Sequence, residues 1–466
     1  MPNIYIETFG CQMNEADSQY VADRAEAAGY AITSVPEEAD VLLINTCTVR
    51  DNAERRAYGR MNHLKVLKDA DPAVRLVVTG CLAEQDRDRM QKLAPHVDAI
   101  FGTKELVRLG DQLEAWQPSF SERVDFSADR ALLAPLGGSA DGVTDAFSHL
   151  RAFVNVQRGC SYYCTFCIVP HVRGRFDHRP IGDVVADVAE KIAGGAREVM
   201  LVGQTVNAWR DTVAGADFGD LCREVARLAG LERLTFISPH PKDFSEKIVA
   251  DLGSLDCLNP RVHLPLQSAS DAVLRRMNRK YTAEQYGQKV DLIRRYLPQA
   301  AITTDIIVGF PGETEADFEA TLDYVATGIF ANAFTFVYSM RRGTPAANWD
   351  QVPADVASAR FARLVEAQNA STLAYHARKR GTIVRALVCG TSKKDASKLA
   401  AKALDNVTVI APKPPDYDDA LYAREPWLSV AIEESRIWGC TGTVVTRAHR
   451  FSENGVPVKS PALSLI

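Results

Sequence analysis

The sequence predicts an α/β multidomain chain with three folded units. These are an N-terminal parallel α/β domain, a central partial (β/α)6 TIM-like barrel and a small antiparallel β-barrel of the OB-like kind. Over most of the chain, short apolar runs with β-branched residues alternate with helical periodicity, as in parallel sheets. Near the C-terminus, strand-like runs follow one another instead. At 466 residues the chain is long enough for two or three domains.

The first unit, residues 1–115, contains strand-like runs that end at cysteines, with helical periodicity between them over residues 17–28 and 52–67. The cysteines are Cys11, Cys47 and Cys81. Any one of these cysteines alone would indicate only an ordinary buried thiol, because free cysteine is common in protein cores. Because the carboxyl ends of parallel strands converge on one crevice, thiols at equivalent strand ends predict one shared site.

Residues 116–147 are rich in helix and strand breakers, so we expect a linker there. From 148 to 375 strands and helices alternate, which predicts the partial barrel. Its expected strands are 152–157, 198–202, 233–237, 261–265, 301–308 and 333–338, with helices such as 181–194 and 282–296. The small β-barrel is expected over 378–447, with a tail at 448–466. Its expected antiparallel strands are 382–389, 407–410, 428–432 and 442–445.

The loop after the first expected strand of the central barrel carries Cys160, Cys164 and Cys167 in the spacing Cx3CxxC. Three thiolates are one ligand short of closing a four-iron cluster, so one iron keeps an open coordination site. The alternatives are buried core thiols, or a zinc loop for which His171 is the nearby fourth ligand. The loop lies at the carboxyl face of the predicted barrel, where barrel enzymes carry their chemistry.

Motifs in a fixed order run along nearly the whole chain. They are 10–14, 45–50, 79–81, 159–174, 203–209, 238–241, 263–268, 309–314 and 338–344. In these residues and spacings the chain resembles the radical S-adenosylmethionine (SAM) methylthiotransferases, and within them the tRNA enzymes that act on isopentenylated adenosine. The resemblance implies a radical SAM barrel in the centre and a TRAM RNA-binding domain at the C-terminus.

The resemblance further implies two [4Fe–4S] clusters and SAM as cofactors. Cys160, Cys164 and Cys167 are expected to hold the SAM-cleaving cluster, and Cys11, Cys47 and Cys81 an auxiliary cluster that carries sulfur. The SAM contacts are expected from Gln204, Asn207, His263, Gln267, Gly309 and Glu313. The implied reaction is methylthiolation at C2 of N6-(dimethylallyl)adenosine at position 37 of tRNA. Gly309 is also readable as a turn glycine and His263 as a core histidine.

Residues beside the cysteines are candidates for tuning the clusters. Asn14, Asn45 and Arg50 are placed to make hydrogen bonds around the auxiliary site, although Asn45 also fits a turn. Tyr163 and Phe166 lie between the cysteines of the central loop, and we expect them to exclude water from its cluster.

The net charge of −5 means that RNA binding requires a local basic patch. Residues 373–402 carry eight Lys or Arg and one Asp. Phosphate contacts are expected there from Arg378, Lys379, Arg380, Lys393 and Lys394. A second basic run, 275–281, is either a further RNA contact or a solvated helix face.

The expected partners are the anticodon stem-loop of tRNA, an electron donor such as flavodoxin or ferredoxin, and proteins that deliver sulfur and clusters. Ten cysteines, a start without a secretory pattern and no apolar stretch near twenty residues predict a cytoplasmic protein without membrane contact. The alternative substrates are threonylcarbamoyl-adenosine in tRNA and an aspartate of a ribosomal protein. A non-catalytic RNA-binding iron–sulfur protein is the alternative of another class.

Overall fold

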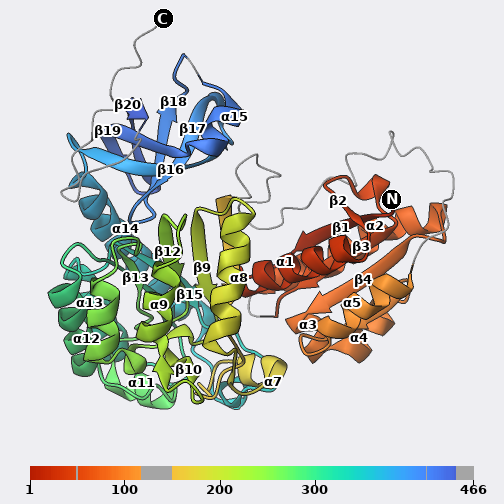
Figure 1. Cartoon of the computed structure of the whole chain (residues 1–466). Helices are drawn as coiled ribbons and strands as arrows, with labels where there is room; N and C mark the ends of the chain where they lie inside the picture. Colours follow the sequence, from red (N-terminus) through yellow and green to blue (C-terminus); the bar gives the residue numbers. More distant parts are fainter. Residues whose placement is uncertain (49–50, 117–149, 416, 448–466) are drawn as a thin grey trace, which may run out of the picture.

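The computed structural model describes residues 1–48, 51–116, 150–415 and 417–447. Figure 1 shows an N-terminal α/β domain beside a central barrel, with a smaller β-barrel beyond one end of it. Apart from Trp116, the expected linker at 116–147 lies outside the described residues, as does the expected tail at 448–466. Within the described residues, no helix is long and apolar enough to span a membrane.

The N-terminal domain is a parallel five-stranded sheet with strand order β2-β1-β3-β4-β5. Its strands are β1 (Asn3–Thr8), β2 (Ala31–Thr33), β3 (Val41–Thr46), β4 (Arg75–Gly80) and β5 (Ala99–Phe101). Its helices are α1 (Gln12–Ala27), α2 (Asp51–Ala70), α3 (Cys81–Gln85), α4 (Arg87–Leu93) and α5 (Leu106–Ala115). Helices α1 and α5 form one hydrophobic core with one face of the sheet, and α2 forms a second core with the other face. Because helices cover both faces, β3 is buried along its whole length. In this strand order ligands bind at the switch between β1 and β3.

The central unit is the expected open barrel of six parallel strands. It consists of two sheets, β6-β9-β12 and β13-β14-β15, linked by a bridge between Leu234 and Leu258. The strands are β6 (Arg151–Asn155), β9 (Glu198–Val202), β12 (Arg233–Phe236), β13 (Arg261–His263), β14 (Ala301–Val308) and β15 (Asn332–Val337). The helices are α8 (Ile181–Ala193), α9 (Phe218–Ala226), α10 (Glu246–Gly253), α11 (Asp271–Arg276), α12 (Ala283–Tyr296) and α13 (Glu315–Ala326).

The strand register separates an interior face of the barrel from the face that packs on helices. Ile302 and Ile306 of β14 lie in the same core as Tyr286 and Val290 of α12. The alternate residue Asp305 therefore points to the interior, and its register partner Phe334 shares that face. The interior wall of β13–β15 is thus partly polar and partly aromatic.

The small C-terminal barrel is closed in the order β16-β17-β18-β20-β19. Its elements are β16 (Ile383–Ser392), β17 (Asp395–Ala403), β18 (Thr408–Pro412), α15 (Asp419–Arg424), β19 (Trp427–Arg436) and β20 (Gly439–Arg447). Strand β17 was not predicted, because its run of Ala and Lys is typical of helices, and pairing with both neighbours determines its conformation. The expectation of purely antiparallel pairing is also wrong, since β18 and β20 are parallel where the barrel closes.

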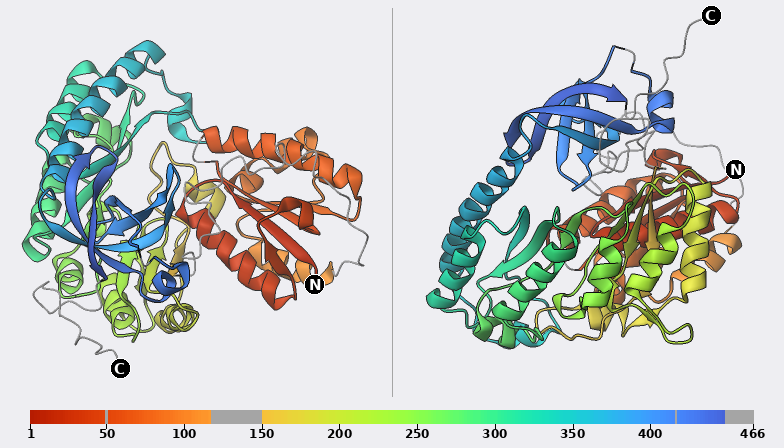
Figure 2. Two further views of the ribbon diagram at one scale, coloured as in Figure 1. Left: turned by 90° about the horizontal axis from the view of Figure 1, so that it is seen from above. Right: turned by 60° about the vertical axis from the view of Figure 1, so that its left-hand side comes forward.

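The C-terminal barrel contacts the amino ends of the central strands. Arg233, the first residue of β12, is 1% exposed, pairs with Glu198 at 2.7 Å and donates to the Ala403 carbonyl at 3.2 Å. Figure 2 shows the long helix α14 (Ala354–Ala377) leading from the central unit into this barrel. The carboxyl ends of the central strands, which lead to the cysteine loop, therefore point away from the C-terminal barrel.

Helix α14 also fixes the turn after β14 through a buried ion pair. Arg360 Nη1 lies 2.9 Å from Glu313 Oε2, and the two side chains are 7% and 1% exposed. We expect Arg360→Ala to lower the free energy of unfolding by about 3–5 kcal/mol, because it leaves the Glu313 carboxylate buried without its cation. The measurement is urea unfolding of the metal-free protein.

The matched control is Arg363→Ala, one turn away on α14, where the arginine is 44% exposed and pairs with Glu315 and Glu319. Arg363→Ala should lower the free energy of unfolding by less than about 1 kcal/mol, because the ion pairs it removes are exposed to solvent. Equal losses from the two variants would contradict the importance of the buried pair.

Candidate functional site: two groups of three cysteines

The three N-terminal cysteines come from adjacent strands of one sheet. Cys11 caps helix α1 after β1, Cys47 follows β3, and Cys81 begins α3 directly after β4. Gly10 has a φ of +140°, and a Cβ there would lie 2.6 Å from the Cβ of Cys47. This close approach requires glycine and holds the Cys11 backbone against Cys47. The expected convergence of strand ends is therefore present at the β1–β3 switch.

Two asparagines organise this group, which we call the auxiliary site. The Sγ of Cys11 lies 3.4 Å from Asn14 Oδ1. The Asn14 amide donates to Asn45 Oδ1 and to the Thr46 carbonyl, both at 2.9 Å. Asn14 and Asn45 are fully buried, so they hold the loops that carry Cys11 and Cys47. Arg50 lies outside the described residues.

The auxiliary site faces the interior of the central barrel. Met13 and Ala16 of α1 pack with Val202 of β9, and Cys11 lies in the same apolar cluster as Phe153, Met200 and Ile237. Helix α1 contacts β6 and β9, and Figures 1 and 2 show the N-terminal domain beside the part of the central barrel that contains β9 and α8. The first cysteine therefore meets barrel strands and not bulk solvent alone.

The second group lies on a loop that two short strands close. Strands β7 (Gln157–Arg158) and β8 (Asp177–His178) pair across its base. Gly159 has a φ of +72°, and a Cβ there would lie 2.0 Å from the Arg175 carbonyl, so the loop closes only with glycine. Within it, helix α7 (Val169–Arg173) begins two residues after Cys167.

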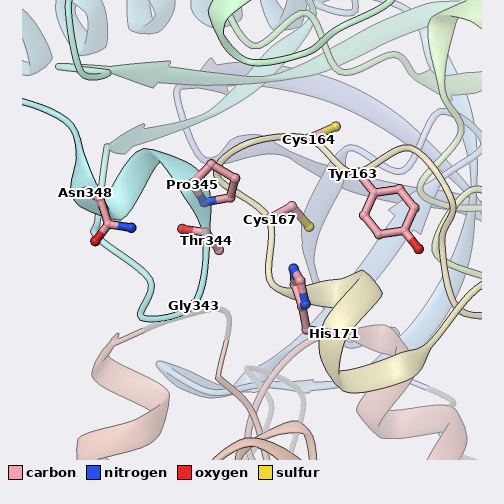
Figure 3. A pocket seen from close by; sticks show the side chains of 8 residues that line it. All are labelled: Tyr163, Cys164, Cys167, His171, Gly343, Thr344, Pro345 and Asn348. Atoms are coloured by element: carbon pink, nitrogen blue, oxygen red, sulfur yellow. The ribbon is translucent and has the colours of Figure 1, made fainter.

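The cysteines of this loop border a pocket. Its volume is about 380 Å³, and it is lined by Tyr163, Cys164, Cys167, His171, Gly343, Thr344, Pro345 and Asn348. Figure 3 shows Cys164 and Cys167 on the loop and His171 on α7, with the segment from Gly343 to Asn348 across from them. Cys160 Sγ lies 3.4 Å from Thr205 Oγ1, so the third thiol is held by the loop after β9.

Burial favours the protonated form of three of these thiols while no metal is bound. It raises the pKa of Cys160, and it raises the pKa of Cys167 to about 12. Burial also raises the pKa of Cys81, against the opposing effect of the nearby Arg173 guanidinium. Thiolates bind metal, so loading either group must release protons.

In the part of the chain that the structure describes, neither group of three cysteines has its sulfur atoms all within 4.8 Å of one another, so their spacing does not fit one zinc ion. Ligands about 2.3 Å from one zinc ion lie within about 4 Å of each other. Among the described residues, the compact group of this kind is Asp217, Asp220 and Asp251, and Lys247 already occupies it with contacts of 2.9–3.0 Å. Cysteines that bind different irons of a cluster stand farther apart than ligands of one ion, so the donor set fits a cluster better.

Two of the six candidate SAM residues present unpaired polar atoms. Both amide atoms of Gln204 are buried without a hydrogen-bond partner among the described residues, as is Gln267 Oε1. Gln267 also has a φ of +70°, a strained conformation for a residue with a side chain. Buried unpaired amides are costly, so they indicate a polar ligand that completes them.

The other four candidates already make contacts within the protein. The Asn207 amide exchanges two hydrogen bonds with the His240 backbone, at 2.8 and 3.0 Å. His263 lies 3.1 Å from Thr303 Oγ1 and 3.3 Å from Asp305 Oδ2 on the interior wall. Glu313 accepts from the Gly309 N–H at 2.8 Å. These contacts hold the segments at the carboxyl ends of β9, β13 and β14.

Sequence reasoning missed two residues next to the loop. Arg279, placed in the second basic run, is partly buried with Nη1 3.5 Å from Cys164 Sγ, so it does not face solvent as expected of an RNA contact. His240 stacks on Tyr162 with ring centroids 4.3 Å apart, and burial lowers its pKa to about 2, so it stays neutral. No local pattern signals either contact, because both partners are distant in sequence.

The aromatic residues of the loop divide between core and surface. Phe166 packs edge-on against Phe310, whereas Tyr163 is 44% exposed at the pocket. On the interior wall, Phe334 and Phe336 are 44% and 39% exposed, and Phe334 lies edge-on to His263. Exposed aromatic rings on this interior wall suit a ligand with an apolar part.

The expected RNA-binding residues occupy opposite ends of strand β16. Arg378 and Arg380 are exposed at the end of α14, whereas Lys393 and Lys394 are exposed at the β16–β17 turn. Ten residues of strand separate these pairs by roughly 30 Å. Lys379 forms an ion pair with Asp405 and is 18% exposed, so it contributes less to any surface patch.

Comparison with known proteins assigns the two units that carry the groups of three cysteines. Residues 3–102 match the uncharacterized protein family UPF0004, and residues 154–325 match the radical SAM superfamily. Among solved structures, the radical SAM methyltransferase TsrM from Kitasatospora setae matches with a TM-score of 0.53 and 16% identity, covering 74% of this chain and 75% of TsrM. This likeness shows the fold.

Curated relatives match over most of their length. A tRNA-2-methylthio-N(6)-dimethylallyladenosine synthase from Acidothermus cellulolyticus is 43% identical, with 87% of this chain and 82% of the relative covered. Synthases of the same name from Chromobacterium violaceum and Thermoanaerobacter sp. are 41% and 39% identical, with 88% and 95% of this chain covered and 92% and 93% of the relatives. The chain therefore belongs to the tRNA-2-methylthio-N(6)-dimethylallyladenosine synthase family within the radical SAM superfamily.

Proposed function

We propose that this protein methylthiolates C2 of N6-(dimethylallyl)adenosine at position 37 of tRNA. The observation that carries the proposal is the position of Cys11, which packs with Met200 on β9 and with Ile237 directly after β12. The auxiliary site and the radical SAM loop thereby face one barrel. A reaction that needs both a sulfur atom and a radical at one carbon requires this arrangement.

The residues present fit the implied cofactors. The two groups of three cysteines would each hold a [4Fe–4S] cluster, and the unpaired amides of Gln204 and Gln267 would bind SAM. When bound, these groups supply a carbon-centred radical, a methyl group and sulfur. Asn207, His263, Gly309 and Glu313 position the loops around SAM through the contacts described above. Phe166 and Tyr163 limit the access of water.

The C-terminal barrel is proposed to act as a TRAM-like domain that binds the tRNA backbone. Arg378 and Arg380 at one end of β16, and Lys393 and Lys394 at the other, would contact phosphates of the anticodon stem-loop. The C-terminal barrel lies at the amino ends of the central strands, the longest of which, β14, is about 25 Å long. The anticodon loop must therefore reach along the central barrel for the target base to meet the clusters.

We place this activity in the cytoplasm, where thiols remain reduced. The proposed reaction also requires an electron donor such as flavodoxin or ferredoxin, and proteins that deliver sulfur and clusters. Methylthiolation of threonylcarbamoyl-adenosine or of a ribosomal protein remains an outcome that substrate tests distinguish.

Loss of one cysteine should affect the reaction differently in each of the two groups. Reconstituted Cys164→Ala protein should form no 5′-deoxyadenosine, because the radical SAM cluster loses a ligand. Cys47→Ala protein should still form 5′-deoxyadenosine but give no 2-methylthio product. Both products are measured by mass spectrometry on prenylated tRNA.

Cys440→Ala is the control, since Cys440 is a buried thiol of the C-terminal barrel; this variant should retain both activities. Normal methylthiolated product from Cys47→Ala would overturn the proposed role of the auxiliary site.

The aromatic interior wall should recognise the prenyl group. Phe334→Ala should lower kcat/KM for prenylated tRNA about tenfold, which corresponds to about 1.4 kcal/mol of lost apolar contact. Formation of 5′-deoxyadenosine without tRNA should not change. The matched control is Val337→Ala on the opposite face of β15, which is 39% exposed. Equal effects of the two variants would show that Phe334 does not face the substrate.

The β16–β17 turn should contribute electrostatic affinity. Lys393→Ala together with Lys394→Ala should weaken tRNA binding and reduce the slope of log K against log salt concentration by roughly one to two. Binding is measured by filter retention from low to physiological salt. Lys398→Ala, whose ammonium already pairs with Asp395 at 3.0 Å, is the control. An unchanged slope in the double variant would place the RNA elsewhere.

A further inference from the structure

Arg173 connects the two cysteine groups through one short segment. It is the last residue of α7, six positions after Cys167, yet its guanidinium lies in the N-terminal domain. Its Nε is 3.2 Å from Cys81 Sγ, and its Nη2 is 2.7 Å from Asp17 Oδ2. A loop that carries one group of cysteines thus places a cation against a ligand of the other.

The contact is buried on both sides. The side chains of Arg173 and Asp17 are 4% and 2% exposed. The second carboxylate oxygen of Asp17 is buried and has no hydrogen-bond partner among the described residues. Val172, next to Arg173, packs with Cys81 and Ile168. A charge held this firmly, with so little water around it, acts strongly on the nearby sulfur.

We propose that Arg173 is a positioning residue that sets the charge around the auxiliary cluster, and that Asp17 opposes it. The proposal rests on the proposed function, in which Cys81 holds that cluster. Hydrogen bonds to sulfur and nearby charge set the reduction potentials of iron–sulfur clusters. The Arg173 N–H and its positive charge favour the reduced, more negative cluster, whereas the Asp17 carboxylate disfavours it.

A purely structural role gives a different expectation. If Arg173 only joined the two domains, losing either member of the pair would loosen the site in the same way. An electrostatic role instead predicts shifts of opposite sign for the two variants. Arg279 lies beside Cys164 of the other group, so its substitution tests whether removing an arginine far from the auxiliary site also shifts the potential.

The test uses the full chain with Cys160, Cys164 and Cys167 all replaced by alanine, so that only the auxiliary site loads iron. The midpoint potential of the cluster is measured by redox titration with electron paramagnetic resonance. Arg173→Gln should shift the potential to more negative values, and Asp17→Asn to less negative values. Arg173→Lys should lie between Arg173→Gln and the parent, because it keeps the charge but not the fork geometry. Arg279→Gln should leave the potential unchanged.

Shifts of the same sign from Arg173→Gln and Asp17→Asn, or no shift from either, would overturn the proposal while leaving the proposed function intact. If Arg173→Gln binds no iron, Asp17→Asn alone tests the proposal. A shift of its midpoint potential to less negative values would support an electrostatic role, and a shift to more negative values would contradict it. If the parent chain of this series binds no iron, the auxiliary site does not hold a cluster. That result would contradict both the proposed function and the proposed role of Arg173.

Discussion

The packing of helix α1 against strands β6 and β9 is the contact on which the rest of the site depends. Met13 and Ala16 pack with Val202 and Phe153, and the Phe153 N–H donates to Gln19 at 3.1 Å. Since the residue that caps α1 is Cys11, this apolar contact also places a metal ligand at the barrel. Burial of apolar surface stabilises the packing of α1 against the barrel, and the polar contacts fix the orientation of the helix.

Polar contacts between the same two domains surround that packing. Arg342 of the barrel pairs with Asp86, and the Thr103 hydroxyl donates to the Val172 carbonyl. Each contact has one partner close to a cysteine group, since Asp86 follows the short helix that begins at Cys81, and Val172 lies on α7 after Cys167. The interface therefore restricts how the two groups of cysteines are oriented towards one another, and this restriction suits a reaction whose parts come from two domains.

Much of the fold was predictable, as was the placement of three cysteines at strand ends and three on one loop, because the relevant signals are local. Alternation of strand and helix patterns gives the six-unit barrel, and cysteines at strand ends indicate where loops converge. The strand β17 was not predictable, since partners on both sides override the helix-like composition of its Ala and Lys residues. The roles of Arg173 and Arg279 were equally hidden, because each depends on a sulfur about a hundred residues away.

The candidate SAM residues show the same limit. Gln204 and Asn207 lie in one motif, yet one side chain is unpaired and the other is bonded to the His240 backbone. A motif identifies the loop that matters, whereas the packing of its neighbours decides which side chain faces the ligand.

The most direct test of the proposed reaction on tRNA is nucleoside mass spectrometry of tRNA from cells that lack this protein. We expect loss of 2-methylthio-N6-(dimethylallyl)adenosine and accumulation of N6-(dimethylallyl)adenosine, both reversed by the intact gene but not by a Cys47→Ala copy. An unchanged level of the methylthiolated nucleoside would contradict the proposed reaction.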